Sequence, residues 1–106
     1  GNPRPWINLG GQYALDGDDD LAADAYRMAM TLAANPARSL DERVHGHGIA
    51  AANLALLQCA AGDVVGALVI TGSAIGPVPV SPDLKRVHVW LSERQRDGGC
   101  VPRSSY

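Results

Sequence analysis

Hydrophobic residues along the chain recur at the three- and four-residue spacing of amphipathic helices. A first stripe, within residues 5–16, consists of Trp6, Leu9, Gly10 and Tyr13. A second stripe, within residues 21–34, consists of Leu21, Ala22, Ala25, Met28, Ala29 and Leu32. Gly17 separates the two stripes, and Asn35-Pro36 ends the second one because a residue before proline avoids the helical region. The pattern therefore predicts two helices joined by a tight turn.

Capping residues indicate where two further helices begin. Ser39 and Glu42 fit a capping box, and the segment 49–61 behind them is almost wholly apolar, which predicts a helix buried on most sides. Two glycines in His45-Gly46-His47-Gly48 each weaken a helix by about 1 kcal/mol, so we expect either a kink there or a start at Gly48. Ser81-Pro82-Asp83 opens a last helix. Its apolar stripe is Leu84, Val87, Trp90 and Leu91, and it ends before Gly98.

The segment from Val64 to Ile75 suits a strand by its β-branched residues and a helix by its length. An internal repeat favours the helix. A shift of 45 residues places Asn8-Leu9 on Asn53-Leu54 and Gly17-Asp18 on Gly62-Asp63. Two copies of one helix–turn–helix unit explain this most simply, and the expected fold class is all-α.

Composition places the chain among small globular domains, either complete or part of a larger protein. It has 106 residues, of which 46% are hydrophobic and 19% charged, and it contains no Phe. The core must therefore be built from Leu, Val, Ile and Ala. With a net charge of −2, the chain lacks the excess of basic residues that is typical of a nucleic-acid binder. No apolar run is long enough to span a membrane, so we expect neither nucleic acid nor a membrane as a partner.

The two cysteines do not suggest a disulfide scaffold. Cys59 lies in the apolar segment 49–61 and is expected to act as a small buried hydrophobe. Cys100 lies in a glycine-rich tail and is expected to be a free thiol. Because the first residues also lack the apolar run of a secretion signal, the expected location is the cytoplasm.

No segment of the sequence carries a strong signal for metal binding or for catalysis. His45 and His47 are two residues apart, so on a helix they point to different sides and share no metal ion. The aspartates around Gly17 lack the terminal Glu of a calcium loop and suit helix capping better. No serine has a nucleophile-elbow motif, and Gly72–Gly76 lacks the Lys-Ser/Thr ending of a phosphate loop. We expect no metal, no cofactor and no enzymatic activity.

The residues of the repeat resemble the tetratricopeptide repeat family. The first copy reads Trp6-x-x-Leu9-Gly10-x-x-Tyr13, then Ala22-x-x-x-Tyr26 and Ala29. The second copy keeps Asn53-Leu54-Ala55, Gly62-Asp63, Ala67 and Ala74, with Gln58 and Thr71 in place of the aromatics. Gly10 and Ala22 are small where the paired helices cross, Tyr13 and Tyr26 fill the adjacent space, and Gly17 forms the turn. The repeat spacing exceeds the family's by about eleven residues, which indicates an insertion around 36–47.

The resemblance implies a short helical array. Its parts are a first hairpin at 5–34, a second and longer hairpin at 39–76, a covering helix at 81–97 and a flexible tail at 98–106. Two repeats are fewer than such arrays usually need, so either the last helix completes the core, or the chain dimerises or continues in a longer protein. A generic helical bundle is the alternative fold.

The resemblance also implies a binding surface, because the first helix of each unit lines the inner groove in that family. The matching positions are Ile7, Asn8, Gly11, Ala14, Leu15, Ile49, Ala52, Asn53, Leu56 and Cys59. This groove is apolar, and it lacks the lysine and arginine clamp with which some members bind a C-terminal carboxylate. The implied function is non-catalytic protein–protein interaction, in which the groove binds a partner helix or peptide or a second copy of the chain.

Three alternatives to this function remain open. The first is a ligand- or peptide-sensing segment of a bacterial-type transcriptional regulator. The second is a small helical enzyme or an accessory subunit of one, although no polar constellation points to a reaction. The third is a groove that is filled from within and binds nothing.

Overall fold

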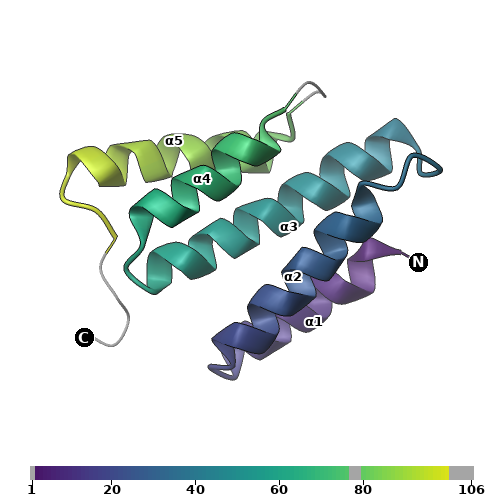
Figure 1. Ribbon diagram of the computed structural model, residues 1–106, viewed down its shortest axis with the longest axis horizontal. Coiled ribbons are helices and arrows are strands. Elements are labelled where there is room, and N and C mark those ends of the chain that lie inside the picture. Colours follow the sequence, from purple (N-terminus) through teal and green to yellow (C-terminus); the bar gives the residue numbers. More distant parts are fainter. Residues whose placement is uncertain (1, 77–79, 101–106) are drawn as a thin grey trace.

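The computed structural model describes residues 2–76 and 80–100, and these form five helices with no strand among them. The helices are α1 (Pro3–Leu15), α2 (Asp19–Ala33), α3 (Leu40–Ala60), α4 (Val64–Ala74) and α5 (Pro82–Arg96). Figure 1 shows α3 between the α1–α2 pair and the α4–α5 pair. The all-α class is thus confirmed, and the ambiguous segment from Val64 is a helix. Residues 101–106 of the expected tail lie outside the described residues.

The turns after α1 and α3 have the same construction. Gly17 and Gly62 have φ angles of +83° and +91°, which glycine adopts without a steric penalty. In each turn the next residue donates its N–H five positions back, from Asp18 to the Tyr13 carbonyl at 2.9 Å and from Asp63 to the Gln58 carbonyl at 3.1 Å. The predicted turn at Gly17 is confirmed, and its counterpart lies 45 residues later.

α1 and α2 cross at closest approach where Gly10 lies against the ring of Tyr26. A Cβ at Gly10 would lie only 2.6 Å from Cε1 of Tyr26. Ala22 is fully buried, Tyr26 is 5% exposed, and the half-buried Tyr13 packs into the same cluster. The small and aromatic positions of the first hairpin therefore pack as the sequence predicted.

The core around α3 is made largely of alanine. The fully buried apolar side chains of the described residues include nine alanines (Ala22, Ala25, Ala29, Ala33, Ala50, Ala51, Ala52, Ala55 and Ala67), whereas the valines and isoleucines are at most half-buried. Short side chains let helix axes approach closely, and α3 contacts each of the other four helices. Ile70, Ile75 and Val87 are half-buried and pack against this core, so Val and Ile contribute to it as expected, but as partly buried side chains.

α3 runs from Leu40 to Ala60 through its two glycines, so the expected alternative of a start at Gly48 is wrong. Ser39 caps it by accepting the Glu42 N–H at 3.2 Å. A Cβ at Gly46 would lie 3.1 Å from Cγ of Pro3, and one at Gly48 would lie 2.6 Å from Oγ of Ser81. Each glycine thus allows another segment to approach the α3 backbone.

α5 covers the open side of α3 and α4, but not with every residue of its predicted stripe. Leu84 and Leu91 are buried and Val87 is half-buried, whereas Trp90 is 39% exposed and carries the guanidinium of Arg94 over its ring. At about 100° per residue, His88 lies about 40° from Leu84 around the helix and so near the inner face, whereas Trp90 lies about 120° away. His88 is half-buried, and its Nδ1 forms a 2.7 Å hydrogen bond with the buried hydroxyl of Thr71 on α4, which makes it an interhelical contact.

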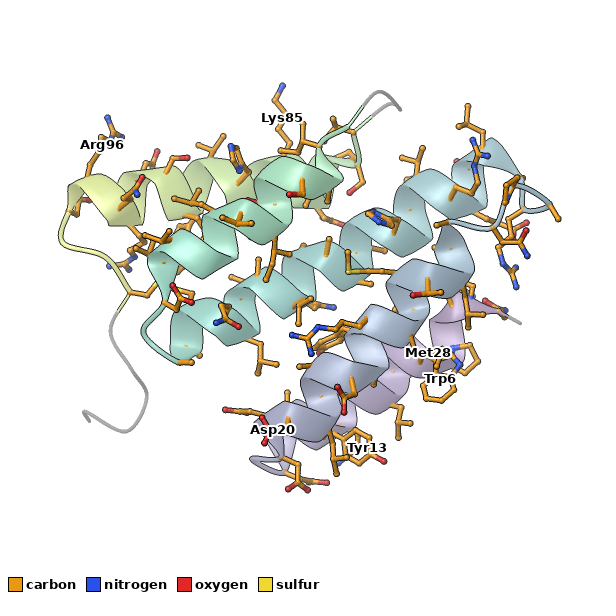
Figure 2. All side chains as sticks on the ribbon, in the orientation of Figure 1. Trp6, Tyr13, Asp20, Met28, Lys85 and Arg96 are labelled. Atoms are coloured by element: carbon orange, nitrogen blue, oxygen red, sulfur yellow. A yellow bond between two sulfur atoms is a disulfide. The ribbon has the colours of Figure 1, made fainter. Side chains whose placement is uncertain are left out.

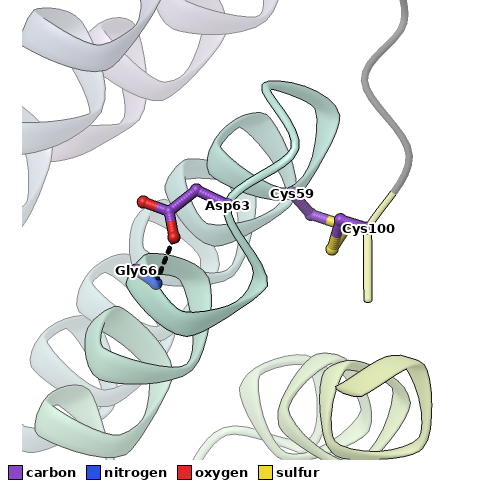
Figure 3. The surroundings of a disulfide bond; sticks show 4 residues. All are labelled: Cys59, Asp63, Gly66 and Cys100. Carbon is purple, nitrogen blue, oxygen red and sulfur yellow. Dashed lines mark hydrogen bonds between the residues drawn. A yellow bond between two sulfur atoms is a disulfide. The ribbon is translucent and has the colours of Figure 1, made fainter. Parts of the chain in front are cut away.

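Cys100 is not a free thiol, which is the main correction to the sequence analysis. It forms a disulfide with Cys59, which lies near the end of α3 (Figure 3). Gly98 and Gly99 both have positive φ angles and reverse the chain after α5, and the Gly99 N–H donates to the Arg94 carbonyl. This reversal brings two cysteines 41 positions apart into contact. Cys59 is buried, as expected.

Candidate interaction site

The two helical hairpins match except at the beginning of α3. α1 ends at Leu15 and α3 at Ala60, while α2 begins at Asp19 and α4 at Val64, a separation of 45 residues in both cases. The same offset from Pro3 at the start of α1 predicts that α3 begins at Gly48, yet it begins eight residues earlier at Leu40. Most of the predicted insertion is therefore helix, and it extends α3 beyond the length of α1.

A cleft of about 530 Å³ lies between α1 and the extended part of α3, and we call it the α1–α3 cleft. Three of the predicted groove residues line it, Ile7 and Asn8 from α1 and Ile49 from α3. Its other lining residues are Pro3, Arg4, Asp41, Glu42, His45 and Gly46. The cleft thus joins side chains that are about 40 positions apart in the sequence.

The remaining predicted groove residues do not line this cleft. Ala52 is 4% exposed and packs with Leu84 in the core beneath α5. Leu15 is 84% exposed at the end of α1, and Leu56 is 39% exposed. Gly11, Ala14 and Asn53 are half-buried, and Cys59 is held in the disulfide.

Charged residues of the α3 extension form one wall of the α1–α3 cleft, and the sequence analysis did not include them. Asp41 lies 3.2 Å from Nε2 of His45. Glu42 accepts a 2.8 Å hydrogen bond from Arg38, and this bond, with a second from the Ser39 hydroxyl, holds the pKa of Glu42 below its usual value. The signal in the sequence was the capping box of the insertion, because Asp41 and Glu42 lie within it.

The two histidines of the insertion face different clefts. His45 lines the α1–α3 cleft, whereas His47 lines a cleft on the other side of α3. This separation agrees with the two-residue spacing, which places side chains on different sides of a helix. Across residues 2–76 and 80–100, no group of three His, Cys, Asp or Glu side chains could hold a metal ion.

The strongest surface charges lie away from both clefts. Four of the nine basic residues are on α5, namely Lys85, Arg86, Arg94 and Arg96, whereas the turn between α1 and α2 carries Asp16, Asp18, Asp19 and Asp20. Figure 2 shows Lys85 and Arg96 extending from α5 and Asp20 at the opposite side of the view. The α1–α3 cleft is therefore distinguished by its mixed apolar and polar lining rather than by a strong charge.

Comparison with protein-family models, curated proteins and solved structures gave no significant match. Among the described helices, none has both the length and the hydropathy needed to cross a membrane. The chain is therefore interpreted from its own geometry.

Proposed function

We propose that the chain is a non-catalytic interaction module of the tetratricopeptide-repeat type that binds a partner peptide in the α1–α3 cleft. One observation carries this proposal. Ile7, Asn8 and Ile49 come from the first helices of two successive hairpins, at positions mapped to the inner groove, and they line one cleft. The equal spacing of the helix ends and the matching glycine turns support a repeated unit.

The lining of the cleft favours a peptide with neighbouring apolar and basic residues. Ile7 and Ile49 are half-buried and would contact an apolar side chain. The exposed amide of Asn8 can bond to a peptide backbone, because it offers both donors and an acceptor. The side chain of Asp41 is 86% exposed, so a Lys or Arg of the peptide can reach its carboxylate.

The disulfide changes the compartment that we propose for this function. The cytoplasmic location was expected partly because Cys59 and Cys100 were expected to be unpaired, and their pairing removes that reason. Disulfides persist in oxidising compartments and are rare in the reducing cytosol. We therefore place the interaction in an oxidising compartment.

Selection from a random peptide library tests the proposal. Peptides selected on the wild-type chain would be labelled, and their Kd measured by fluorescence polarisation against Ile7→Glu, Asn8→Ala and the control Val65→Glu. Val65 is 60% exposed on α4 and does not line the α1–α3 cleft. We expect Ile7→Glu to raise Kd by about tenfold or more and Val65→Glu to leave it unchanged, since each 1.4 kcal/mol is about tenfold in affinity.

Two outcomes would contradict the proposal. The first is a set of selected peptides whose Kd values are unaffected by both cleft variants while circular dichroism shows that the variants fold. The second is a dimer, detected by light scattering across a dilution series, that Ile7→Glu converts to a monomer. In that case the occupant of the cleft is a second copy of the chain.

A further inference from the structure

A second cleft lies on the side of α3 that faces away from α1. It has a volume of about 350 Å³ and lies where the end of α2, the extended part of α3, the end of α4 and the start of α5 meet. We call it the basic cleft. Its wall is mainly apolar, with Ala33, Val44, Ala74, Val80 and Leu84 among the lining residues.

Arg43 and His47 are the titratable side chains of this wall. Four residues apart on α3, they lie one helical turn from each other. Both are half-buried, and neither side chain forms a hydrogen bond or ion pair with any part of the chain that the structure describes. Burial lowers the pKa of His47, which favours the neutral imidazole with its one N–H donor.

No carboxylate balances the charge of Arg43 within the basic cleft, since no Asp or Glu is among its described lining residues. The contrast with the α1–α3 cleft is direct, because there Asp41 and Glu42 lie on the opposite face of α3. The half-buried Arg43 side chain has no partner among the described residues, and a carboxylate is the group that matches the planar, two-pronged geometry of its guanidinium.

We propose that the basic cleft binds a small amphiphile in which a carboxylate is joined to a short apolar tail. Arg43 holds the carboxylate, with His47 as a second donor, and the apolar wall contacts the tail. The volume of about 350 Å³ corresponds to about twelve water-sized groups at roughly 30 Å³ each, which leaves room for a molecule of about ten non-hydrogen atoms. Octanoate matches this size. The site is separate from the α1–α3 cleft and does not depend on peptide binding there.

Isothermal titration calorimetry on the whole disulfide-bonded chain tests this site with three probes: octanoate, octanol and inorganic phosphate. We expect octanoate to bind with a Kd about tenfold or more below those of octanol and phosphate. Arg43→Gln should raise the octanoate Kd by about tenfold or more, because a charge-assisted pair is lost. The control Arg96→Gln removes the same charge from an exposed position at the end of α5 and should have no effect.

Ala74→Leu provides a test that leaves the charge unchanged. Ala74 lines the basic cleft and is half-buried, so a larger side chain fills the space for the tail and should abolish octanoate binding. Circular dichroism verifies that each variant folds. The proposal is overturned if octanoate does not bind at millimolar concentration, if octanol or phosphate binds as tightly, or if Arg43→Gln and Arg96→Gln behave alike.

Discussion

Gly10 shows how one missing side chain decides the packing of a helical pair. It is buried on α1 against Tyr26 of α2, whose ring lies where a Cβ would project. Gly11 beside it has only the Tyr26 hydroxyl near its Cβ direction, at 3.9 Å. Burial also raises the pKa of that hydroxyl, because the charged phenolate is disfavoured. Neighbouring glycines in one helix thus differ in whether glycine is required.

Substituting alanine at these two positions separates packing from helix propensity. Gly10→Ala should lower the free energy of unfolding by about 1–3 kcal/mol, because the new methyl group displaces a buried ring. Gly11→Ala should leave it unchanged or raise it by up to about 1 kcal/mol, since alanine favours a helix. Urea unfolding followed by circular dichroism measures both, and equal effects of the two substitutions would contradict this account.

At the level of elements, α3 is the central helix, and its two halves have different roles. Its C-terminal half packs alanines against the neighbouring helices, and its N-terminal extension provides one wall of each cleft. α5 then docks at Gly48, where Ser81 approaches the α3 backbone. Ser81 is 2% exposed and caps α5 by accepting the Leu84 N–H at 3.1 Å. The start of α5 therefore packs directly on the middle of α3, and this contact links the positions of the two helices.

Gly48→Ala tests this link between α3 and α5. A Cβ there would lie 2.6 Å from Oγ and 2.7 Å from Cβ of Ser81, so the start of α5 must move. We expect the free energy of unfolding to fall by about 1–3 kcal/mol. Compared with the wild type, amide hydrogen exchange should speed up more across α5 than across α2. Gly72→Ala on α4 is the matched control, since nothing lies within 4 Å of its Cβ direction. A Gly48→Ala chain as stable as the wild type would refute the link.

At the scale of the whole molecule, the disulfide closes the array at its C-terminal end. The described residues have principal extents of 42 × 29 × 16 Å, and few large side chains are fully buried among them. A core built mainly of alanine buries less apolar surface per residue than one of leucine, because burial energy scales with area. The disulfide between Cys59 and Cys100 offsets this smaller burial energy, because it lowers the conformational entropy of the unfolded chain.

Replacing both cysteines by serine should therefore cost substantial stability. Chain entropy for a separation of 41 residues gives about 4 kcal/mol, which thermal unfolding would reveal as a lower Tm. A reducing agent should lower the Tm of the wild type and leave that of the double variant unchanged. If thiol titration of the oxidised chain in denaturant finds two free thiols, the disulfide does not form.

Local sequence was sufficient for most of the helices and for their turns. Apolar spacing, the capping serines and the Gly-Asp pairs determine these elements through neighbours only a few residues away, so four of the five helices and the turn at Gly17 could be predicted from them. The same holds for the Gly10–Tyr26 contact, because the helices of a hairpin are adjacent in the chain. The helix α4 needed the internal repeat as well, because its β-branched residues also suit a strand. Three residues of the α1–α3 cleft followed from the repeat.

Only the tertiary structure decided the contacts between distant segments. The pairing of Cys59 with Cys100 depends on a chain reversal after α5, and the inward position of His88 depends on how α5 rotates against α4. The glycines at 46 and 48 weaken a helix in isolation, yet α3 continues through them because Pro3 and Ser81 pack where side chains would be. Likewise, Arg43 and His47 line one cleft only because four helices meet beside them. Local propensity is set within one turn of helix, whereas these features depend on packing energy shared between elements far apart in the chain.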